Sequence, residues 1–185
     1  MSLETFSFCP RCGKPLAARP ITDIEGIVST RTACEEACGF IQWKNPVPVV
    51  GALVEHEGEI VLARNQAWPE GWFALVTGYL EANEDPREGV AREVKEELGL
   101  EVERSELIGN YIFERKNEVV MCYHVVATGR IALGRELAEV RRHQPAELRP
   151  WRRATGLAVA DWMRARGLEV RWDERAALKS EPTRT

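Results

Sequence analysis

The chain has 185 residues, of which 44% are hydrophobic, and this size suits one ordinary domain with or without a small appendage. Its formal net charge of −4 excludes a polyanion binder built on overall charge, so nucleic-acid binding would need a local basic patch. No apolar run reaches the roughly 18 residues of a spanning helix, and the first residues lack the basic and apolar regions of a signal peptide, so we expect a soluble, cytoplasmic protein without a membrane partner.

Residues 1–44 contain four of the five cysteines, arranged as two pairs, Cys9-Pro-Arg-Cys12-Gly and Cys34-Glu-Glu-Ala-Cys38-Gly. In a reducing compartment, cysteines bind metals or remain thiols more often than they form disulfides. Two such pairs indicate a zinc ribbon, in which four thiolates close a tetrahedral structural site. The second pair is one residue longer than the usual Cys-x2-Cys, so four reduced thiols in a small β-rich arm remain the alternative.

The prolines in Asn45-Pro-Val-Pro48 mark a boundary, because each proline fixes its own φ and favours an extended predecessor. Two β-branched runs follow, Val47–Glu55 and Glu59–Arg64, and the intervening Glu57-Gly58 predicts that they form a β-hairpin. Trp72–Thr77 is the next strand candidate. We therefore divide the chain into a zinc-ribbon arm at 1–44, a main domain at 45–172 and a flexible tail at 173–185.

Pro86–Leu98 predicts a helix. Pro86 suits a first turn, Asp85 or Asn83 suits the N-cap, and Gly99 stands where a left-handed C-cap belongs.

The remainder of the chain predicts further strands and a second helix. The expected elements are strands at Glu101–Phe113 and Glu118–Ala127, a short element at Glu147–Trp151 and a helix at Thr155–Arg166. Strands interleaved with two helices predict an α/β or α+β sandwich with helices packed on a sheet.

Apolar and acidic side chains occupy adjoining edges of the first predicted helix. At about 100° per residue, the apolar edge holds Val90, Val94 and Leu98, and the acidic edge holds Glu93, Glu96 and Glu97. Clustered carboxylates raise one another's pKa values, and a divalent cation removes that cost. Oxygen-only ligands suit Mg²⁺ or Mn²⁺, which also bind substrate phosphates. The pattern favours phosphoryl chemistry, although Glu-x-x-Glu-Glu alone is also typical of an exposed acidic helix edge.

The whole stretch from Gly78 to Leu100 fits Gly-x5-Glu-x7-Arg-Glu-U-x-Glu-Glu-x-Gly-U, where U is apolar. The matching positions are Gly78, Glu84, Arg92, Glu93, Val94, Glu96, Glu97, Gly99 and Leu100. This is the Nudix box, so the chain resembles the Nudix hydrolases. The resemblance implies an α/β/α sandwich around a mixed sheet, preceded here by the zinc ribbon. It also implies a Mg²⁺- or Mn²⁺-dependent pyrophosphatase, which cleaves the diphosphate bond of a nucleoside diphosphate linked to another group and releases a nucleoside monophosphate.

The resemblance also assigns roles to the box residues. Catalysis and metal binding are assigned to Glu93, Glu96 and Glu97, with the Gly78 carbonyl in the metal shell, Arg92 orienting the glutamates and Glu84 at the first acidic position. Many relatives add a carboxylate from a later loop. The stretch Arg135-Glu-Leu-Ala-Glu resembles such a loop, which makes Glu136 the candidate metal ligand and Glu139 the second choice, while an exposed loop pair is the alternative. Which carboxylate acts as the general base stays open.

A zinc ribbon joined to a Nudix domain resembles the NADH pyrophosphatase group and its shorter relatives, which include FAD and ADP-ribose pyrophosphatases. The NADH enzymes carry Ser-Gln-Pro-Trp-Pro-Phe-Pro after the box, and Ile108–Asn117 does not match it. We therefore expect a dinucleotide or an ADP-ribose- or FAD-like small molecule, without assigning NADH specificity. Because many relatives are homodimers, the resemblance also implies a homodimer.

Four residues near the box are candidate substrate contacts. Tyr79 and Phe73 offer rings that stack on a base, although core packing is the default for aromatics, while Glu114 and Arg115 are candidates for facing the diphosphate. Cys122 stands in an apolar strand and is predicted to be a buried, inert thiol.

Two other functions remain as alternatives. The first is an RNA cap-processing enzyme that holds RNA with the zinc ribbon and with the basic string Arg141, Arg142, Arg149, Arg152 and Arg153, for which a solvated face is the plainer interpretation. The second is a non-catalytic Nudix-like sensor. Such proteins usually lose box glutamates, and all of them are present here.

Overall fold

The computed structural model describes residues 6–36 and 38–174. Most of the predicted tail, from residue 175 onward, lies outside the described residues. The described chain divides into two compact units, one comprising the residues up to Pro46 together with 115–117, and one comprising the rest. No helix within the described residues has both the length and the apolar character needed to cross a bilayer.

The N-terminal unit contains a small antiparallel sheet in the order β1-β2-β3. Its strands are β1 (Leu16–Thr22), β2 (Val28–Cys34) and β3 (Ile41–Gln42). The turn between β1 and β2 is held by Asp23, whose carboxylate accepts hydrogen bonds from the backbone N–H groups of Glu25 and Ile27, both at 2.9 Å. Few side chains of this sheet are buried, which explains why its strands show no clear hydrophobic period in the sequence.

The second unit is built on a mixed sheet, in which the described residues form six strands. They are β4 (Val47–His56), β5 (Glu59–Asn65), β6 (Val76–Tyr79), β7 (Glu101–Phe113), β8 (Glu118–Thr128) and β9 (Leu137–His143). The hydrogen-bonded order is β7-β8-β4-β5-β9, and β6 pairs with β4. The central pair β4–β8 is parallel, whereas the other pairs are antiparallel.

Strand β4 has different partners along its two halves. Its last residues pair with β5, with Val54 opposite Val61, and its first half pairs with β6, with Val50 opposite Gly78. This arrangement places the first residue of the box against the central strand of the sheet.

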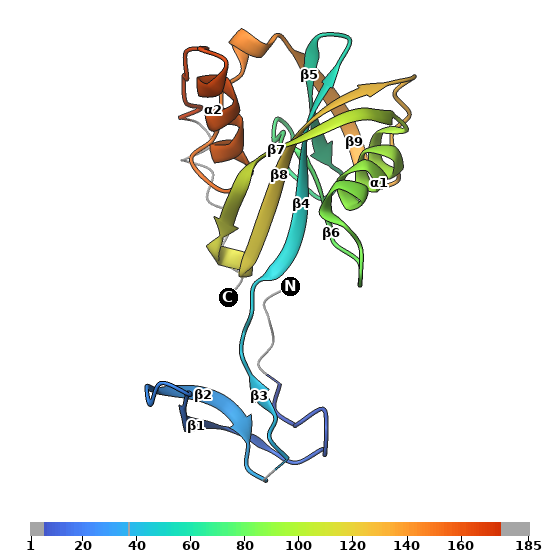
Figure 1. Cartoon of the computed structure of the whole chain (residues 1–185). Coiled ribbons are helices and arrows are strands. Elements are labelled where there is room, and N and C mark those ends of the chain that lie inside the picture. Colours follow the sequence, from blue (N-terminus) through green and yellow to red (C-terminus); the bar gives the residue numbers. More distant parts are fainter. Residues whose placement is uncertain (1–5, 37, 175–185) are drawn as a thin grey trace. The chain divides into compact units, whose positions relative to one another are not determined.

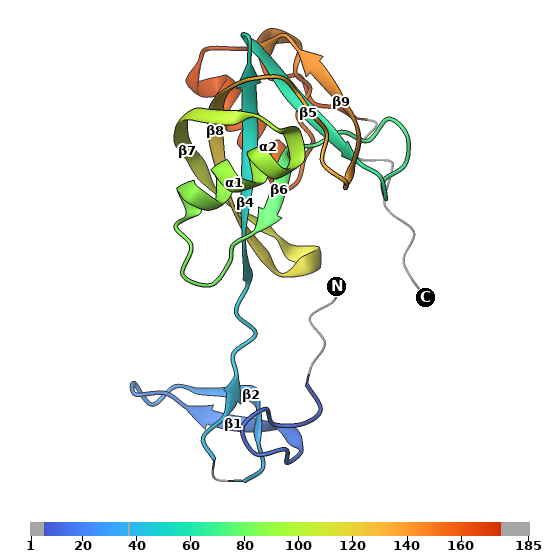
Figure 2. The ribbon, with the colours of Figure 1, turned by 90° about the vertical axis from the view of Figure 1, so that its right-hand side faces the viewer.

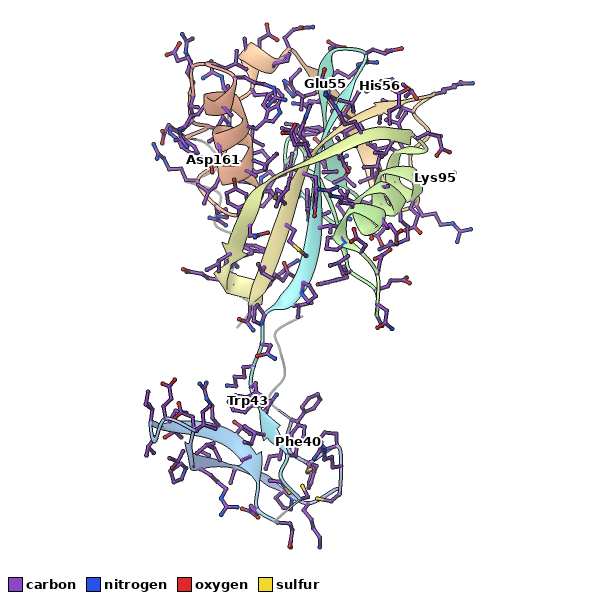
Figure 3. The ribbon with its side chains drawn as sticks, viewed as in Figure 1. Phe40, Trp43, Glu55, His56, Lys95 and Asp161 are labelled. Atoms are coloured by element: carbon purple, nitrogen blue, oxygen red, sulfur yellow. The ribbon has the colours of Figure 1, made fainter. Side chains whose placement is uncertain are left out.

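The helices α1 (Pro86–Leu98) and α2 (Thr155–Ala165) cover opposite faces of this sheet, as Figures 1 and 2 show. In Figure 3, the labelled Lys95 marks α1 and Asp161 marks α2. Each helix buries its apolar edge in a separate cluster, and β4 contributes to both by alternation, with Val50, Ala52 and Val54 toward α1 and Val49 and Leu53 toward α2. The predicted α/β/α sandwich with a mixed sheet is confirmed.

The predicted helix Pro86–Leu98 is confirmed, with the apolar edge fully buried. Asp85 is the N-cap, and its side chain accepts a hydrogen bond from the Arg87 N–H at 2.8 Å. Gly99 closes the helix in the left-handed region at φ +69°, where a glycine costs least.

Two expected elements are wrong in their bounds. The strand expected at Trp72–Thr77 begins only at Val76 and runs to Tyr79, because the residues before it make just one isolated bridge, between Ala74 and Ala63. The short element expected at Glu147–Trp151 is instead the 3-10 turn η2 at Pro145–Glu147.

Strand β9 is absent from the sequence-based prediction, and a β-bulge explains why. Arg64 pairs with Glu139 but the next residue, Asn65, pairs with Leu137, so Ala138 is an extra residue on β9. The bulge lets Leu137 and Val140 pack on the same cluster although they are three residues apart. The strand therefore lacks the period of two by which strands are found in sequences.

Candidate active site

The guanidinium of Arg92 is the centre of a hydrogen-bond network that joins the box loop to α1. It donates to both carboxylate oxygens of Glu84, at 2.7 and 3.0 Å, which is a bidentate geometry. It also donates to Glu93 at 2.7 Å, to Glu96 at 3.2 Å and to the Tyr79 carbonyl at 3.1 Å. Arg92 thus fixes the positions of three box glutamates and of the end of β6.

Gly78 lies against the carboxylate of Glu93. A Cβ atom built on Gly78 would overlap the carboxyl carbon and both oxygens of Glu93, so no residue with a side chain fits unless Glu93 moves. The Glu93 carboxylate is consequently held between the backbone of β6 and the guanidinium of Arg92.

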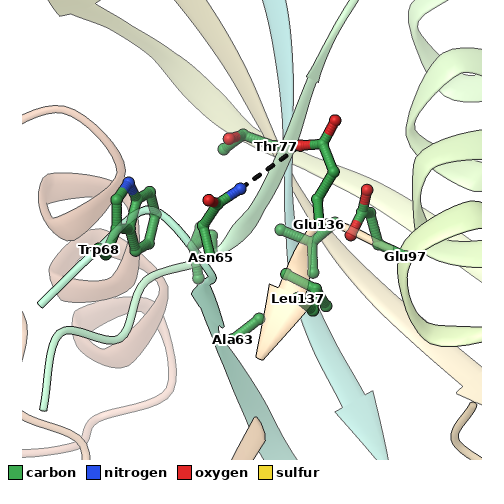
Figure 4. A pocket seen from close by; sticks show the side chains of 9 residues that line it. Ala63, Asn65, Trp68, Thr77, Glu97, Glu136 and Leu137 are labelled. Carbon is green, nitrogen blue, oxygen red and sulfur yellow. Dashed lines mark hydrogen bonds between the residues drawn. The ribbon is translucent and has the colours of Figure 1, made fainter. Parts of the chain in front are cut away.

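Glu97 and Glu136 line a hollow at one end of the sheet (Figure 4). Glu97 comes from the last turn of α1, and Glu136 precedes β9 directly. The hollow is completed by residues of β5, β6 and the loop between them: Ala63, Asn65, Trp68, Leu75, Val76 and Thr77, with Leu137 of β9. The carboxylates of Glu97 and Glu136, which are distant in the sequence, thus lie beside each other in one hollow.

The structure distinguishes the two candidates for the later carboxylate. Glu136 lines the hollow, and its carboxylate accepts a hydrogen bond from Asn65 at 3.4 Å. Glu139 instead forms an ion pair with Arg64 at 2.7 Å on the paired strand and is not among the lining residues. The geometry favours Glu136.

The environment shifts the pKa values of three box carboxylates in different directions. The hydrogen bonds from Arg92 lower the pKa of Glu84 from 4.5 to about 2, so this carboxylate is a permanent anion at neutral pH. Burial raises the pKa of Glu93. Burial, followed by the negative charge of Glu136, raises the pKa of Glu97. The two deepest glutamates therefore carry their charges at a free-energy cost.

A divalent cation fits this donor set because it would relieve that cost. The Oε2 atom of Glu97 is buried and has no hydrogen-bond partner among the described residues, and carboxylate oxygens are the ligands that Mg²⁺ and Mn²⁺ prefer. Unlike the cysteines described below, the box glutamates, all of which the structure describes, do not bring three ligand atoms within 4.8 Å of one another. Arg92 binds oxygens of both Glu93 and Glu96.

The four candidate substrate residues lie outside the lining of the hollow. Tyr79 is half exposed and donates its hydroxyl hydrogen to Glu118 at 3.1 Å. Phe73 packs on the α2-side cluster, and Arg141 stacks over its ring at 4.1 Å. Glu114 and Arg115 lie in the 3-10 turn η1 (Glu114–Lys116) between β7 and β8.

Two polar residues of the hollow were not predicted from the sequence, namely Asn65 and Thr77. They lie at the end of β5 and in β6. Their place beside Glu97 depends on the pairing of both strands with β4, which no local motif in the sequence signals.

The four N-terminal cysteines form a second site. Among the residues that the structure describes, they are the one group that brings three or more candidate metal-ligand atoms within 4.8 Å of one another. The Sγ atoms of Cys9 and Cys38 are 3.6 Å apart, and those of Cys12 and Cys34 are 3.5 Å apart. This cluster is compatible with a zinc ion despite the longer second pair.

The basic string does not form one free surface. Arg142 is paired with Glu57 at 2.8 Å and with Glu59 at 2.6 Å, Arg141 covers Phe73, and Arg152 stacks over Trp172 at 4.6 Å. The two carboxylates neutralise Arg142, whereas the aromatic rings orient Arg141 and Arg152.

Comparison with known proteins identifies the family. Residues 45–163 match the family model described as NUDIX domain. The chain belongs to the Nudix family. Among solved structures, this Nudix chain is similar to a NUDIX hydrolase from Nitrosomonas europaea, with 28% identity and a TM-score of 0.70 over 90% of this chain and 96% of that one. An ADP-ribose pyrophosphatase from Streptococcus suis shares the fold at 21% identity and a TM-score of 0.53, over 70% of this chain and all of that one.

Curated relatives of this Nudix chain include two named for nicotinamide dinucleotides. It is 31% identical over 117 residues to the NAD-capped RNA hydrolase NudC of Pseudomonas aeruginosa. It is 27% identical over 135 residues to the mitochondrial NAD(P)H pyrophosphatase NUDT13 of Mus musculus. The matches cover 63% and 72% of this chain but only 39% and 36% of those relatives, so the chain spans about two fifths of their length.

Proposed function

We propose that this chain is a Mg²⁺- or Mn²⁺-dependent hydrolase that cleaves the diphosphate bond of a dinucleotide or of an ADP-ribose- or FAD-like molecule and releases a nucleoside monophosphate. The observation that carries the proposal is the hollow in which Glu97, with a buried and unpartnered oxygen, lies beside Glu136. The names of the relatives, which refer to NAD-capped RNA and to NAD(P)H, support a dinucleotide.

Each box residue has a task in this proposal. The ligands are Glu93, Glu96, Glu97 and Glu136 with the Gly78 carbonyl. When bound, the divalent ion neutralises diphosphate charge and lowers the pKa of a water molecule. Arg92 orients Glu93 and Glu96, and Glu84 holds Arg92 through its two hydrogen bonds. A carboxylate next to the water would accept its proton.

A substrate screen with Mg²⁺ and with Mn²⁺ tests the proposal. NADH, NAD, ADP-ribose, FAD, diadenosine polyphosphates and nucleoside triphosphates are compared by chromatography of the products. We expect a nucleoside monophosphate from at least one compound with a diphosphate bridge, and loss of that turnover in Glu97→Gln. Turnover that survives Glu97→Gln would disprove the metal assignment. Failure on every compound would favour the non-catalytic sensor instead.

RNA with a dinucleotide cap is a second candidate substrate, because one relative is named for it. The pairing of Arg142 with Glu57 and Glu59 weighs against a continuous basic surface along the string. A capped RNA and the free dinucleotide are therefore compared at 50 and 200 mM salt, chosen because phosphate contacts weaken steeply over about this range. A capped RNA that is preferred at low salt and loses this preference at high salt would favour the RNA substrate.

We also propose that residues 1–44 form a zinc ribbon and that 45–172 form the hydrolase domain. The close approach of four sulfur atoms supports the zinc assignment. Elemental analysis of the purified protein is expected to give about one zinc per chain, and Cys12→Ser is expected to lower it. A homodimer, which the family resemblance implies, is tested by light scattering.

A further inference from the structure

The segment that follows β5 holds the segment that carries Glu136. The backbone N–H of Gln66 donates to the Glu136 carbonyl at 2.8 Å. The side-chain amide of Gln66 donates to the Arg135 carbonyl at 2.9 Å and to the Leu137 carbonyl at 3.3 Å. Gln66 thus binds three consecutive backbone carbonyls, that of Glu136 and those of the residues before and after it.

The neighbouring Asn65 reaches the Glu136 side chain itself. Its Oδ1 atom accepts a hydrogen bond from the Ala67 N–H at 2.9 Å, and because only the oxygen of the amide accepts, Nδ2 is the atom that faces Glu136. Asn65 Nδ2 then donates to Glu136 Oε2 at 3.4 Å, which is the dashed line in Figure 4. The turn at Ala67 therefore sets the direction of the donor.

The bulge in β9 lies next to these contacts. With Ala138 as the extra residue, Asn65 pairs with Leu137 and Gln66 reaches Glu136. On the other side of the bulge, the Arg64–Glu139 ion pair fixes the strands, and Arg64 also donates to the Trp68 carbonyl at 3.3 Å. The end of β5 and the segment that carries Glu136 are therefore held together on both sides of the bulge.

We propose that Asn65 and Gln66 are positioning residues that hold Glu136 in place beside Glu97. Gln66 sets the backbone position of Glu136, and Asn65 directs its carboxylate into the hollow. This inference rests on the proposed function, in which Glu136 and Glu97 bind a divalent ion. Hydrogen-bond partners behind metal ligands typically contribute 10- to 100-fold to metal affinity or activity, because they fix the orientation of the ligand.

The test separates the contact with Glu136 from the stability of the turn. Asn65→Ser keeps an oxygen that accepts from the Ala67 N–H but is too short to reach Glu136. Gln66→Ala removes the side-chain hydrogen bonds to the Arg135 and Leu137 carbonyls and keeps the backbone hydrogen bond to Glu136. Gln144→Ala is the matched control, because Gln144 makes a comparable side-chain hydrogen bond, to Glu59 at 3.2 Å, at the other end of the same strand pair. Thermal melting verifies that each variant is folded.

Mn²⁺ affinity is measured by calorimetry without substrate, and kcat and KM are measured separately, both in the natural background and in Glu136→Gln. We expect Asn65→Ser to weaken Mn²⁺ binding and lower kcat by about tenfold with little change in KM. In the Glu136→Gln background, the same substitution is expected to change either quantity less than about twofold, because the residue acts through Glu136. Gln66→Ala is expected to show the same dependence on Glu136, and Gln144→Ala to match the natural protein.

Equal losses of Mn²⁺ affinity and kcat in the natural and the Glu136→Gln backgrounds would overturn the inference. It would also be overturned if Asn65→Ser and Gln66→Ala behaved like Gln144→Ala. A Glu136→Gln variant that binds Mn²⁺ normally would also overturn it, since nothing would then remain to be positioned. The proposed function fails separately, when Glu97→Gln retains full turnover. Loss of turnover in Glu97→Gln together with normal Asn65→Ser and Gln66→Ala variants would reject the positioning role alone.

Discussion

At the scale of single residues, Glu84 acts on the site through Arg92, and its effect on stability depends on pH. Its pKa in the folded chain is about 2, below the ordinary 4.5, so folding favours the ionised carboxylate. This stabilisation is fully present above about pH 4.5 and is lost as the pH falls toward about 2. We predict that Glu84→Gln lowers the free energy of unfolding at pH 7 and that the difference from the natural protein shrinks below pH 4.5. Urea titrations at several pH values measure this difference. Glu103→Gln is the control, because Glu103 is exposed on β7.

Gly78 is a position where a single methyl group should disturb the site directly. A side chain there displaces the Glu93 carboxylate, and a shift of about 1 Å in a catalytic group can cost 100-fold in rate. We predict that Gly78→Ala lowers kcat by about that factor while the protein remains folded by circular dichroism. The matched control is Gly58→Ala, at a hairpin turn where a Cβ meets nothing within 4 Å but must adopt φ +78°. Equal activities of the two variants would contradict the prediction.

The sequence was most informative where the site is local. Glu93, Glu96 and Glu97 lie within little more than one helical turn, so the helical period predicted their common edge. Asn65 and Trp68 reach the same hollow through the pairing of strands that are distant in the sequence. The proposed contacts at Tyr79 and Phe73 followed from proximity in the chain, and the structure places both outside the lining of the hollow.

At the scale of elements, α1 begins at a cap that can be removed without touching the glutamates. The Asp85 side chain accepts from the Arg87 N–H, and loss of such a cap costs about 1 kcal/mol. We predict that Asp85→Ala lowers the free energy of unfolding by about that amount, whereas Asp85→Asn, which keeps an accepting oxygen, changes it by a few tenths. Urea unfolding compares the two. Equal losses would mean that the charge of Asp85, and not its hydrogen bond, stabilises the helix.

The elements also show where sequence-based prediction succeeds. Helix α1 has a cap, an apolar edge and a terminal glycine that agree with one another, and its bounds were predicted correctly. Strand β9 has a bulge at Ala138 and charged residues at an edge of the sheet, so its apolar residues follow neither period. Its first residues were expected to belong to a loop because Arg135-Glu-Leu-Ala-Glu resembles the carboxylate-bearing loop of many relatives.

At the scale of the whole molecule, the five cysteines should separate into two classes of reactivity. Burial raises the pKa of Cys122 to about 12, and its side chain is fully buried. We predict that the four N-terminal cysteines react with a thiol reagent once a chelator has removed zinc, whereas Cys122 reacts only after denaturation. A colorimetric thiol titration counts them. Full reactivity of the four without a chelator would contradict the zinc assignment.

The parallel pairing of β4 with β8 has a consequence for the order of events during synthesis. Val47 lies opposite Glu118. Strand β4 can therefore pair with β8 only after the whole box has been synthesised. Contacts between such distant segments form late, since a long loop must close first. A nascent chain that ends before Glu118 therefore carries each glutamate of the box but has neither the centre of the sheet nor Glu136. On the proposed function, the metal site can form only after Glu136 has been synthesised.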